Sequence, residues 1–183
     1  PPSPQVAAVL HTFATDQLRV YPQPDAKRLR QAIADHHGVS IDSVVVTHAG
    51  DEALRLAVTT FVAPGGVVAS TEPTYSLYSV LAQIQDAQMF TRDLAADWSL
   101  PDDFADAVNA ACAQLTCVVN PHAPSGYLNS HAALELLAEQ LDGVLLVDEA
   151  YADFVDTDRP RSIAERVTER ENLLVLRTFS KGY

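Results

Sequence analysis

Two nearly continuous apolar runs constrain the fold of this chain more than any other feature of its sequence. The run LTCVVN covers residues 115–120, and GVLLVDEAY covers residues 143–151. Apolar runs without alternation are typical of strands that are buried on both faces, as in a parallel sheet covered by helices. Between the two runs, Leu134, Leu137 and Leu141 recur at helical spacing. The pattern therefore predicts a strand–helix–strand unit within an α/β domain.

The rest of the chain shows the same alternation of strands and helices. Further helices are expected at residues 25–37, 49–61, 75–85 and 101–111, and further strands at residues 43–48, 67–71, 88–92 and 172–183. We expect Asp25 to cap the first helix, Gly38 to end it, and Leu29, Ala32 and Ile33 to form its buried stripe. Pro101 is expected in the first turn of the 101–111 helix. The sequence thus predicts six strands in a mostly parallel sheet with helices on both faces, and a ligand at the carboxyl ends of the strands.

Composition excludes several classes of partner. The 183 residues carry 24 acidic and 12 basic side chains, a formal charge of −12, which disfavours nucleic acid and anionic membrane surfaces. No apolar run approaches the roughly 20 residues of a spanning helix, and the start PPSPQVAAVL does not resemble a signal peptide. A soluble, cytoplasmic protein is expected. Cys112 and Cys117 lack the spacing of a metal site or a disulfide framework, so we expect two buried thiols and no metal.

The expected strand ends carry most of the polar residues with chemical potential. They read THAGDEA, STEPTYSLY, NPHAPSG, VDEAY and RTFSK. The motifs GxxxxGK[ST], GxGxxG and GxSxG are absent, which disfavours a P-loop hydrolase, a dinucleotide oxidoreductase and a serine hydrolase. VLLVDEA alone is similar to a Walker B strand, so an ATPase is the alternative on local pattern. Taken together, the strand ends offer a lysine, an acid, an aromatic ring and an anion-binding loop, which is the set that pyridoxal phosphate (PLP) requires.

The motifs YPQP, GDEALRL, PTYSLY, NPHAPSG, VDEAYADF and NLLVLRTFSKGY occur in this order over residues 21–183. In them the chain resembles the class I/II aminotransferases of the aspartate-aminotransferase fold (PLP fold type I), and among these most closely the histidinol-phosphate aminotransferases. The resemblance implies a large PLP-binding domain over residues 25–183, preceded by an N-terminal arm over residues 1–24. It also implies that the family's chain continues, with two ligand-binding arginines, a small domain and one more strand of the large sheet, which would lie between the first and last strands predicted here.

The resemblance also implies roles for individual residues. Lys181 would form the covalent link to PLP and move the proton at the substrate α-carbon. Asp148 would hold the proton on the pyridine nitrogen, Tyr151 would contact the phenolate oxygen, and Tyr75 would stack on the ring. Tyr78, three residues after Tyr75, is interpreted as a packing residue.

Other positions match the family's phosphate site. The loop and first helical turn at Gly50, Asp51 and Glu52 would bind the phosphate through main-chain N–H groups, with the two acids equally well explained as helix-capping residues. The hydroxyls of Thr178 and Ser180 match groups that contact the same phosphate.

Three further positions concern the other subunit and the cofactor oxygen. Tyr21 matches a tyrosine that reaches the phosphate of the other subunit, which implies a homodimer. Ala123 stands where the family commonly has an asparagine that contacts the phenolate oxygen, so His122 is a candidate contact instead. Glu149 matches no family role and is interpreted as a solvated acid.

The resemblance favours transamination between an amino donor and a 2-oxo acid, with L-histidinol phosphate and 2-oxoglutarate as the expected pair. An aromatic aminotransferase and an amino-acid-phosphate decarboxylase use the same residues and stay open. A regulator domain that binds PLP without turnover is the alternative outside enzymes.

Overall fold

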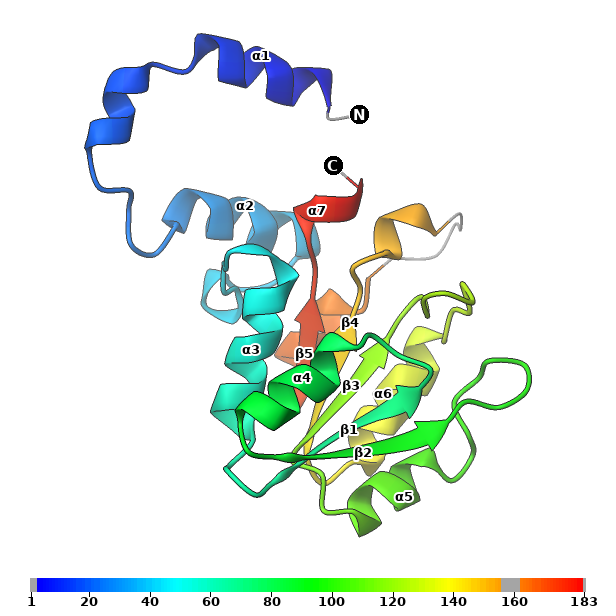
Figure 1. Cartoon of the computed structure of the whole chain (residues 1–183). Coiled ribbons are helices and arrows are strands. Elements are labelled where there is room, and N and C mark those ends of the chain that lie inside the picture. Colours follow the sequence, from blue (N-terminus) through cyan, green and yellow to red (C-terminus); the bar gives the residue numbers. More distant parts are fainter. Residues whose placement is uncertain (1–2, 156–161, 183) are drawn as a thin grey trace.

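The centre of the molecule is a parallel sheet of five strands in the order β2-β1-β3-β4-β5 (Figure 1). We describe it from a computed structural model, which covers residues 3–155 and 162–182. The strands are β1 (Val67–Glu72), β2 (Gln88–Asp93), β3 (Leu115–Val119), β4 (Val144–Asp148) and β5 (Leu173–Leu176). All four neighbouring pairs are parallel, so the predicted α/β class is confirmed.

Helices cover both faces of this sheet. The described helices are α1 (Pro4–Thr12), α2 (Lys27–His37), α3 (Ala49–Phe61), α4 (Leu77–Ile84), α5 (Phe104–Ala110), α6 (His131–Gln140) and α7 (Phe179–Gly182). Short 3₁₀ turns lie at η1 (Thr15–Arg19), η2 (Ile41–Ser43), η3 (Ala152–Phe154) and η4 (Ala164–Thr168). One apolar core packs α3 and α4 against the sheet, and a second packs α5 and α6 against the opposite face. Strand β4 serves both, because Leu146 belongs to the first core while Leu145 and Val147 belong to the second.

The strand predicted at residues 43–48 is wrong. Residues 44–48 form no strand, and Val45 is 79% exposed. A strand requires a neighbour that completes its hydrogen-bond ladder, whereas here the Arg30 guanidinium of α2 donates to the carbonyl oxygens of Ile41 (2.7 Å) and Val44 (2.8 Å). The segment is therefore attached to a helix, and the described sheet has five strands instead of six.

An open apolar groove of about 1010 Å³ lies beside this segment, and we call it the α2–β5 groove. It is lined by side chains of α2, residues 43–47, α3 and the end of the chain from η4 to residue 179. Leu29, Ala32 and Ile33, the predicted buried stripe of α2, face this groove instead of the core. Helical periodicity thus identified the apolar face of α2 correctly, but described residues do not bury it.

Several local predictions need correction. Helix α5 begins at Phe104, so Pro101 lies before it instead of in its first turn. Cys117 is buried as expected, but Cys112 is exposed. The run at 172–183 forms the strand β5 only as far as Leu176, and the short helix α7 follows, while residue 183 lies outside the described residues.

The ends of α2 match the prediction more closely. Gly38 ends the helix with a φ of 67°, a left-handed conformation that glycine adopts at little cost. The Asp25 carboxylate accepts the Lys27 N–H at 3.3 Å, one residue before the N-cap position at Ala26.

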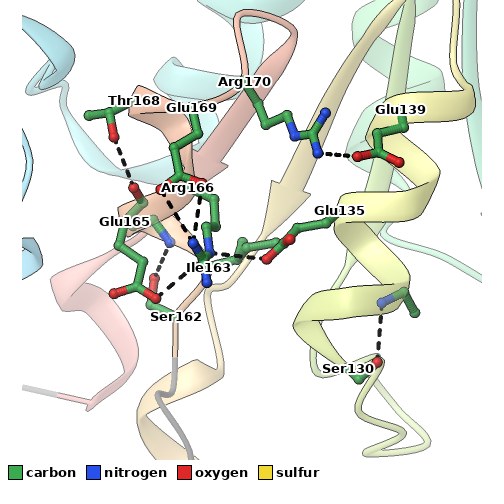
Figure 2. A network of polar contacts seen from close by, with 12 residues as sticks. Ser130, Glu135, Glu139, Ser162, Ile163, Glu165, Arg166, Thr168, Glu169 and Arg170 are labelled. Carbon is green, nitrogen blue, oxygen red and sulfur yellow. Dashed lines mark hydrogen bonds and ion pairs between the residues drawn. The ribbon is translucent and has the colours of Figure 1, made fainter.

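Ion pairs connect η4 to α6 on the outside of the sheet (Figure 2). Arg166 contacts Glu135 of α6 at 3.0 Å and Glu169 at 3.2 Å, and Arg170 contacts Glu139 of α6. All these side chains are partly exposed. Exposed pairs of this kind contribute little to stability, about 0–1 kcal/mol each.

The N-terminal segment lies apart from the sheet (Figure 1). Every residue from Pro4 to Asp25 is exposed, including the apolar side chains of α1. In the described part of the chain, no helix combines the length and the apolarity that crossing a membrane requires.

Candidate active site

The candidate site is built around Asp148, the last residue of β4. Its carboxylate is buried, and each oxygen accepts one hydrogen bond from the protein. The Tyr78 hydroxyl donates to Oδ2 at 2.8 Å, and the Ala150 N–H donates to Oδ1 at 3.0 Å. We call this carboxylate and the groups around it the Asp148 site.

The electrostatics of this carboxylate favour a cationic ligand. Burial raises the pKa of Asp148 above its ordinary value, while the hydrogen bonds from Tyr78 and Ala150 and the charge of Lys181 act in the opposite direction. Among the described residues Asp148 forms no ion pair within 4 Å, and the nearest influence of a cation is the charge of Lys181. A buried anion is costly unless it is paired. A planar ring with a protonated nitrogen fits this requirement.

An aromatic ring lies next to this carboxylate. Tyr75 precedes α4 and its exposed ring meets the Tyr78 ring edge to face, with centroids 5.8 Å apart. Its hydroxyl donates to Asp51 Oδ1 at 3.4 Å, which connects the start of α4 to the first turn of α3. Burial, and then the charge of Asp51, raise the pKa of Tyr75. The exposed face of Tyr75 can therefore stack on a ligand ring.

The amine of the site comes from α7, which follows β5. Lys181 Nζ lies 5.6 Å from the centroid of the Tyr151 ring, within the range of a cation–π contact. Tyr151 follows β4 by three residues, so strands β4 and β5 bring these two side chains together. Both side chains are exposed, so they are accessible to a ligand.

The predicted anion-binding residues lie at the start of α3. The first N–H groups of a helix have no partner within it and attract an anion. Gly50 packs closely against the end of β5, because a Cβ there would lie 3.2 Å from Leu176 Cδ2. This close packing brings the helix start to the strand that leads into Thr178 and Ser180, whose hydroxyls are 3.0 Å apart. The predicted phosphate-site residues are therefore gathered by α3 and β5.

The Glu52 side chain has a different partner. Its Oε2 accepts the His48 N–H at 2.6 Å, where His48 is the N-cap residue of α3. Of the two interpretations left open by the sequence, this geometry supports helix capping for the Glu52 carboxylate.

Two further predicted contacts, Tyr21 and His122, form no side-chain bond with the site residues described so far. Tyr21 is 98% exposed on the N-terminal segment. His122 is buried, with Nδ1 2.7 Å from Ser125 Oγ and Nε2 2.9 Å from the Pro73 carbonyl oxygen, and its ring stacks on Trp98. In this structure both nitrogens of His122 are occupied by protein groups, and its contact with a cofactor stays a prediction.

The interpretation of Glu149 as a solvated acid is wrong. Its carboxylate is buried, where it accepts the Ile163 N–H at 2.8 Å and lies 3.4 Å from Arg177 Nη1. Arg177 also contacts Asp153 at 2.6 Å. Burial raises the pKa of Glu149, and Arg177 opposes that rise. Glu149 is thus a buried partner of Arg177 and Ile163, directly after Asp148 in the chain.

Sequence reasoning also missed the contact of Tyr78 with Asp148. The available signal was the spacing in PTYSLY, because residues three apart lie on the same side of a helix. Tyr75 and Tyr78 could therefore be expected to share one face, but the reach of the Tyr78 hydroxyl to β4 depends on how α4 packs.

Comparison with known proteins places this geometry in a family. Residues 2–183 match the family model for aminotransferase class I and II. Over 183 residues the chain is 36% identical to histidinol-phosphate aminotransferase 1 of Trichormus variabilis and 34% identical to histidinol-phosphate aminotransferase of Geotalea daltonii. It is also similar to the crystal structure of histidinol-phosphate aminotransferase from Sinorhizobium meliloti in complex with pyridoxal-5'-phosphate, with a TM-score of 0.87 and 25% identity over 98% of this chain and 49% of that one.

The alignments with the two curated relatives cover this chain and the relatives to different extents. All of this chain is matched, whereas it spans about half the length of each relative, 50% in both cases. The matched half contains the parallel sheet and every residue of the site described above. On these grounds, the chain belongs to the aminotransferase class I and II family.

Proposed function

We propose that the protein containing this chain is a PLP-dependent aminotransferase that transfers the amino group of L-histidinol phosphate to 2-oxoglutarate. The observation that carries the proposal is the buried Asp148 carboxylate, which forms no ion pair within 4 Å among the described residues and interacts electrostatically with Tyr75 and Lys181. The names and the 34–36% identity of the two curated relatives support the choice of amino donor.

The residues of the Asp148 site fit this cofactor. Asp148 would keep a proton on the pyridine nitrogen, because a buried negative charge attracts the positive charge of the protonated ring. Tyr75 would cover one face of the ring, and Tyr151 would donate to the phenolate oxygen. The N–H groups at Gly50 and Asp51, with the hydroxyls of Thr178 and Ser180, would bind the phosphate.

PLP, when bound, supplies an electron sink for the bond broken at the substrate α-carbon. Lys181 would link the cofactor covalently in the resting protein. Once displaced by the substrate amine, the free Lys181 amine would take the proton from the α-carbon and return it on the cofactor side. The position of Lys181 over Tyr151 keeps the amine at the carboxyl ends of β4 and β5, where both proton positions would lie.

The test is to load the full protein with PLP, reduce it with borohydride and map the labelled peptide. We expect the label on Lys181 and none in Lys181→Ala, and Lys27, the other lysine of these 183 residues, is the internal control. A coupled assay then compares L-histidinol phosphate, L-phenylalanine and L-threonine O-phosphate as donors to 2-oxoglutarate. Labelling of Lys27 instead of Lys181 would contradict the assignment of the lysine. Preference for another donor would contradict the assignment of the substrate.

We further propose that residues 1–24 act as an arm through which Tyr21 reaches the phosphate of a second copy in a homodimer. Its ring is almost fully exposed, so it is available to a partner. The test mixes Lys181→Ala subunits with Tyr21→Phe subunits. If Tyr21 serves the partner's site, each mixed dimer has one fully intact site and regains activity. If Tyr21 serves its own subunit, no intact site forms and activity stays low.

A further inference from the structure

Tyr78 is a buried polar group that the proposed chemistry does not use directly. It lies in the first turn of α4 and is 1% exposed, so its hydroxyl has no access to solvent. A buried hydroxyl without a partner is costly. The 2.8 Å bond to Asp148 Oδ2 satisfies it and crosses from the helix layer to the end of β4.

The phenol is suited to act as a permanent donor. Burial and the neighbouring Asp148 charge raise the pKa of Tyr78 above its ordinary value, so the hydroxyl keeps its proton near neutral pH. The bond direction is therefore fixed, with Tyr78 donating and the carboxylate accepting.

Two donors, one on each oxygen, leave the Asp148 carboxylate little freedom to rotate. Ala150 N–H holds Oδ1 and Tyr78 holds Oδ2. The other charges that act on this group are Asp51 from α3, which raises its pKa, and Lys181 from α7, which lowers it. Of the two donors, only Tyr78 is a side chain, so a substitution at this position can change the hydrogen bonding of the carboxylate.

We propose that Tyr78 is a positioning residue that fixes the orientation of the Asp148 carboxylate and favours its anionic form toward the pyridine nitrogen. The inference rests on the proposed function, since it concerns the same site. The Tyr78 hydroxyl is directed at Asp148 and its ring packs edge to face against Tyr75, so Tyr78 is assigned no contact of its own with the cofactor.

The experiment uses the full protein without cofactor and two matched variants. Tyr78→Phe keeps the ring and its contact with Tyr75 but removes the hydroxyl, and Tyr127→Phe removes a hydroxyl that is not bonded to Asp148. Carbon-13 NMR follows the titration of the Asp148 carboxyl group, and pyridoxamine 5'-phosphate measures affinity without a covalent link. We expect Tyr78→Phe to raise the Asp148 pKa and to weaken pyridoxamine 5'-phosphate binding by about 10- to 100-fold, the usual range for one hydrogen bond to a charged group.

The outcomes separate the two proposals. An unchanged Asp148 pKa and unchanged affinity in Tyr78→Phe would overturn the role of Tyr78 while leaving the proposed function in place. Failure of the unsubstituted protein to bind pyridoxamine 5'-phosphate would overturn the proposed function itself. An equal effect in Tyr127→Phe would also overturn the inference, because the change would not depend on the bond to Asp148.

A second measurement covers the case in which Tyr78→Phe does not fold. Incorporation of 3-fluorotyrosine at position 78 keeps the shape of the side chain and makes the phenol a stronger donor. The proposal predicts a lower Asp148 pKa in this protein, and a constant or higher value would contradict it.

Discussion

The Asp148 site and the α2–β5 groove both border the same sheet, but they differ in which side chains they bury. At the Asp148 site, polar groups are buried and hydrogen-bonded, as Tyr78 and Asp148 show. In the groove, apolar groups from α2, α3 and β5 are left open. In the first region the chain itself supplies the hydrogen-bond partners, and what the Asp148 carboxylate still favours is a cationic ligand. The second presents a surface of the kind that proteins normally cover.

This difference teaches what each kind of sequence signal can establish. Periodicity identifies which side of a helix is apolar, but it does not identify what covers that side. The resemblance to the class I/II aminotransferases places one further strand between residues 43–48 and β5. The groove lies in that position, so we expect it to be covered in the full protein.

The largest expected effect concerns the buried charge at the Asp148 site. Asp148→Asn keeps nearly the same shape but cannot stabilise a protonated pyridine nitrogen. We expect turnover to fall by about a thousandfold, equivalent to about 4 kcal/mol in activation free energy. Asp142→Asn, the same change before the opposite end of β4, is the control, and the coupled assay measures both. Turnover of Asp148→Asn close to that of the control would remove Asp148 from the mechanism.

The second prediction tests the buried acid Glu149, which follows Asp148 in the chain. Arg177→Met leaves Glu149 buried with only its neutral donors, and removing one partner of a buried pair is strongly destabilising. Because Arg177 is partly exposed, we expect a loss of about 2–4 kcal/mol in the free energy of unfolding, at the low end of that principle. Arg166→Met, which removes only exposed pairs, should cost about 1 kcal/mol or less. Equal losses in urea melts would show that Glu149 does not depend on Arg177.

The pH dependence of this variant has a definite sign. Burial raises the folded-state pKa of Glu149 above 4.5, so the folded protein binds this proton more tightly than the unfolded chain. Stability from this group is therefore present at low pH and lost as pH rises through the raised pKa. Without Arg177 the pKa of Glu149 should rise further, so more stability is lost as pH rises. The difference in free energy of unfolding between Arg177→Met and the unsubstituted protein should therefore narrow as pH falls toward 4.5.

The third prediction tests whether the groove is covered. Leu56 of α3 lines it and is 37% exposed in this structure, whereas Leu136 of α6 is 52% exposed on the outer surface. If another segment of the full protein covers the groove, Leu56→Ala should cost about 2–3 kcal/mol, as expected for a buried leucine. Leu136→Ala should cost well under about 1 kcal/mol. Similar small costs for both in the full protein would show that the groove stays open.

Much of the fold could be predicted because the decisive signals are local. The runs at residues 115–120 and 143–151 are apolar enough to be central strands, and β3 and β4 lie there. The run SVVVTH at residues 43–48 is also rich in valine, but strand formation requires a partner strand, which composition does not reveal. The predicted strand ends also indicated that Asp148, Tyr151 and Lys181 lie near one another, because the carboxyl ends of parallel strands share one edge of the sheet.

The remaining features depend on contacts between elements. Glu149 follows Asp148 directly, and alternation along the chain turns its side chain away from the ligand side, where Arg177 and Ile163 enclose it. Nothing in the local sequence VDEAY marks that enclosure. The sequence pattern likewise places Tyr78 on the apolar face of a helix. Only the packing of α4 on the sheet brings its hydroxyl to Asp148.

The smallest expected effect separates two roles for an acid at the edge of the Asp148 site. Glu52 accepts the His48 N–H at the start of α3, so Glu52→Ala should lower the free energy of unfolding by about 1 kcal/mol through loss of a cap. Glu52→Gln keeps an acceptor and should lose less. Because the phosphate is expected to bind main-chain groups, affinity for pyridoxamine 5'-phosphate should change by less than about threefold in either variant. Thermal melts and fluorescence titrations on the full protein measure the two quantities. A large loss of affinity with unchanged stability would place the Glu52 side chain in the phosphate site and would reverse the assignment made here from its hydrogen bond to His48.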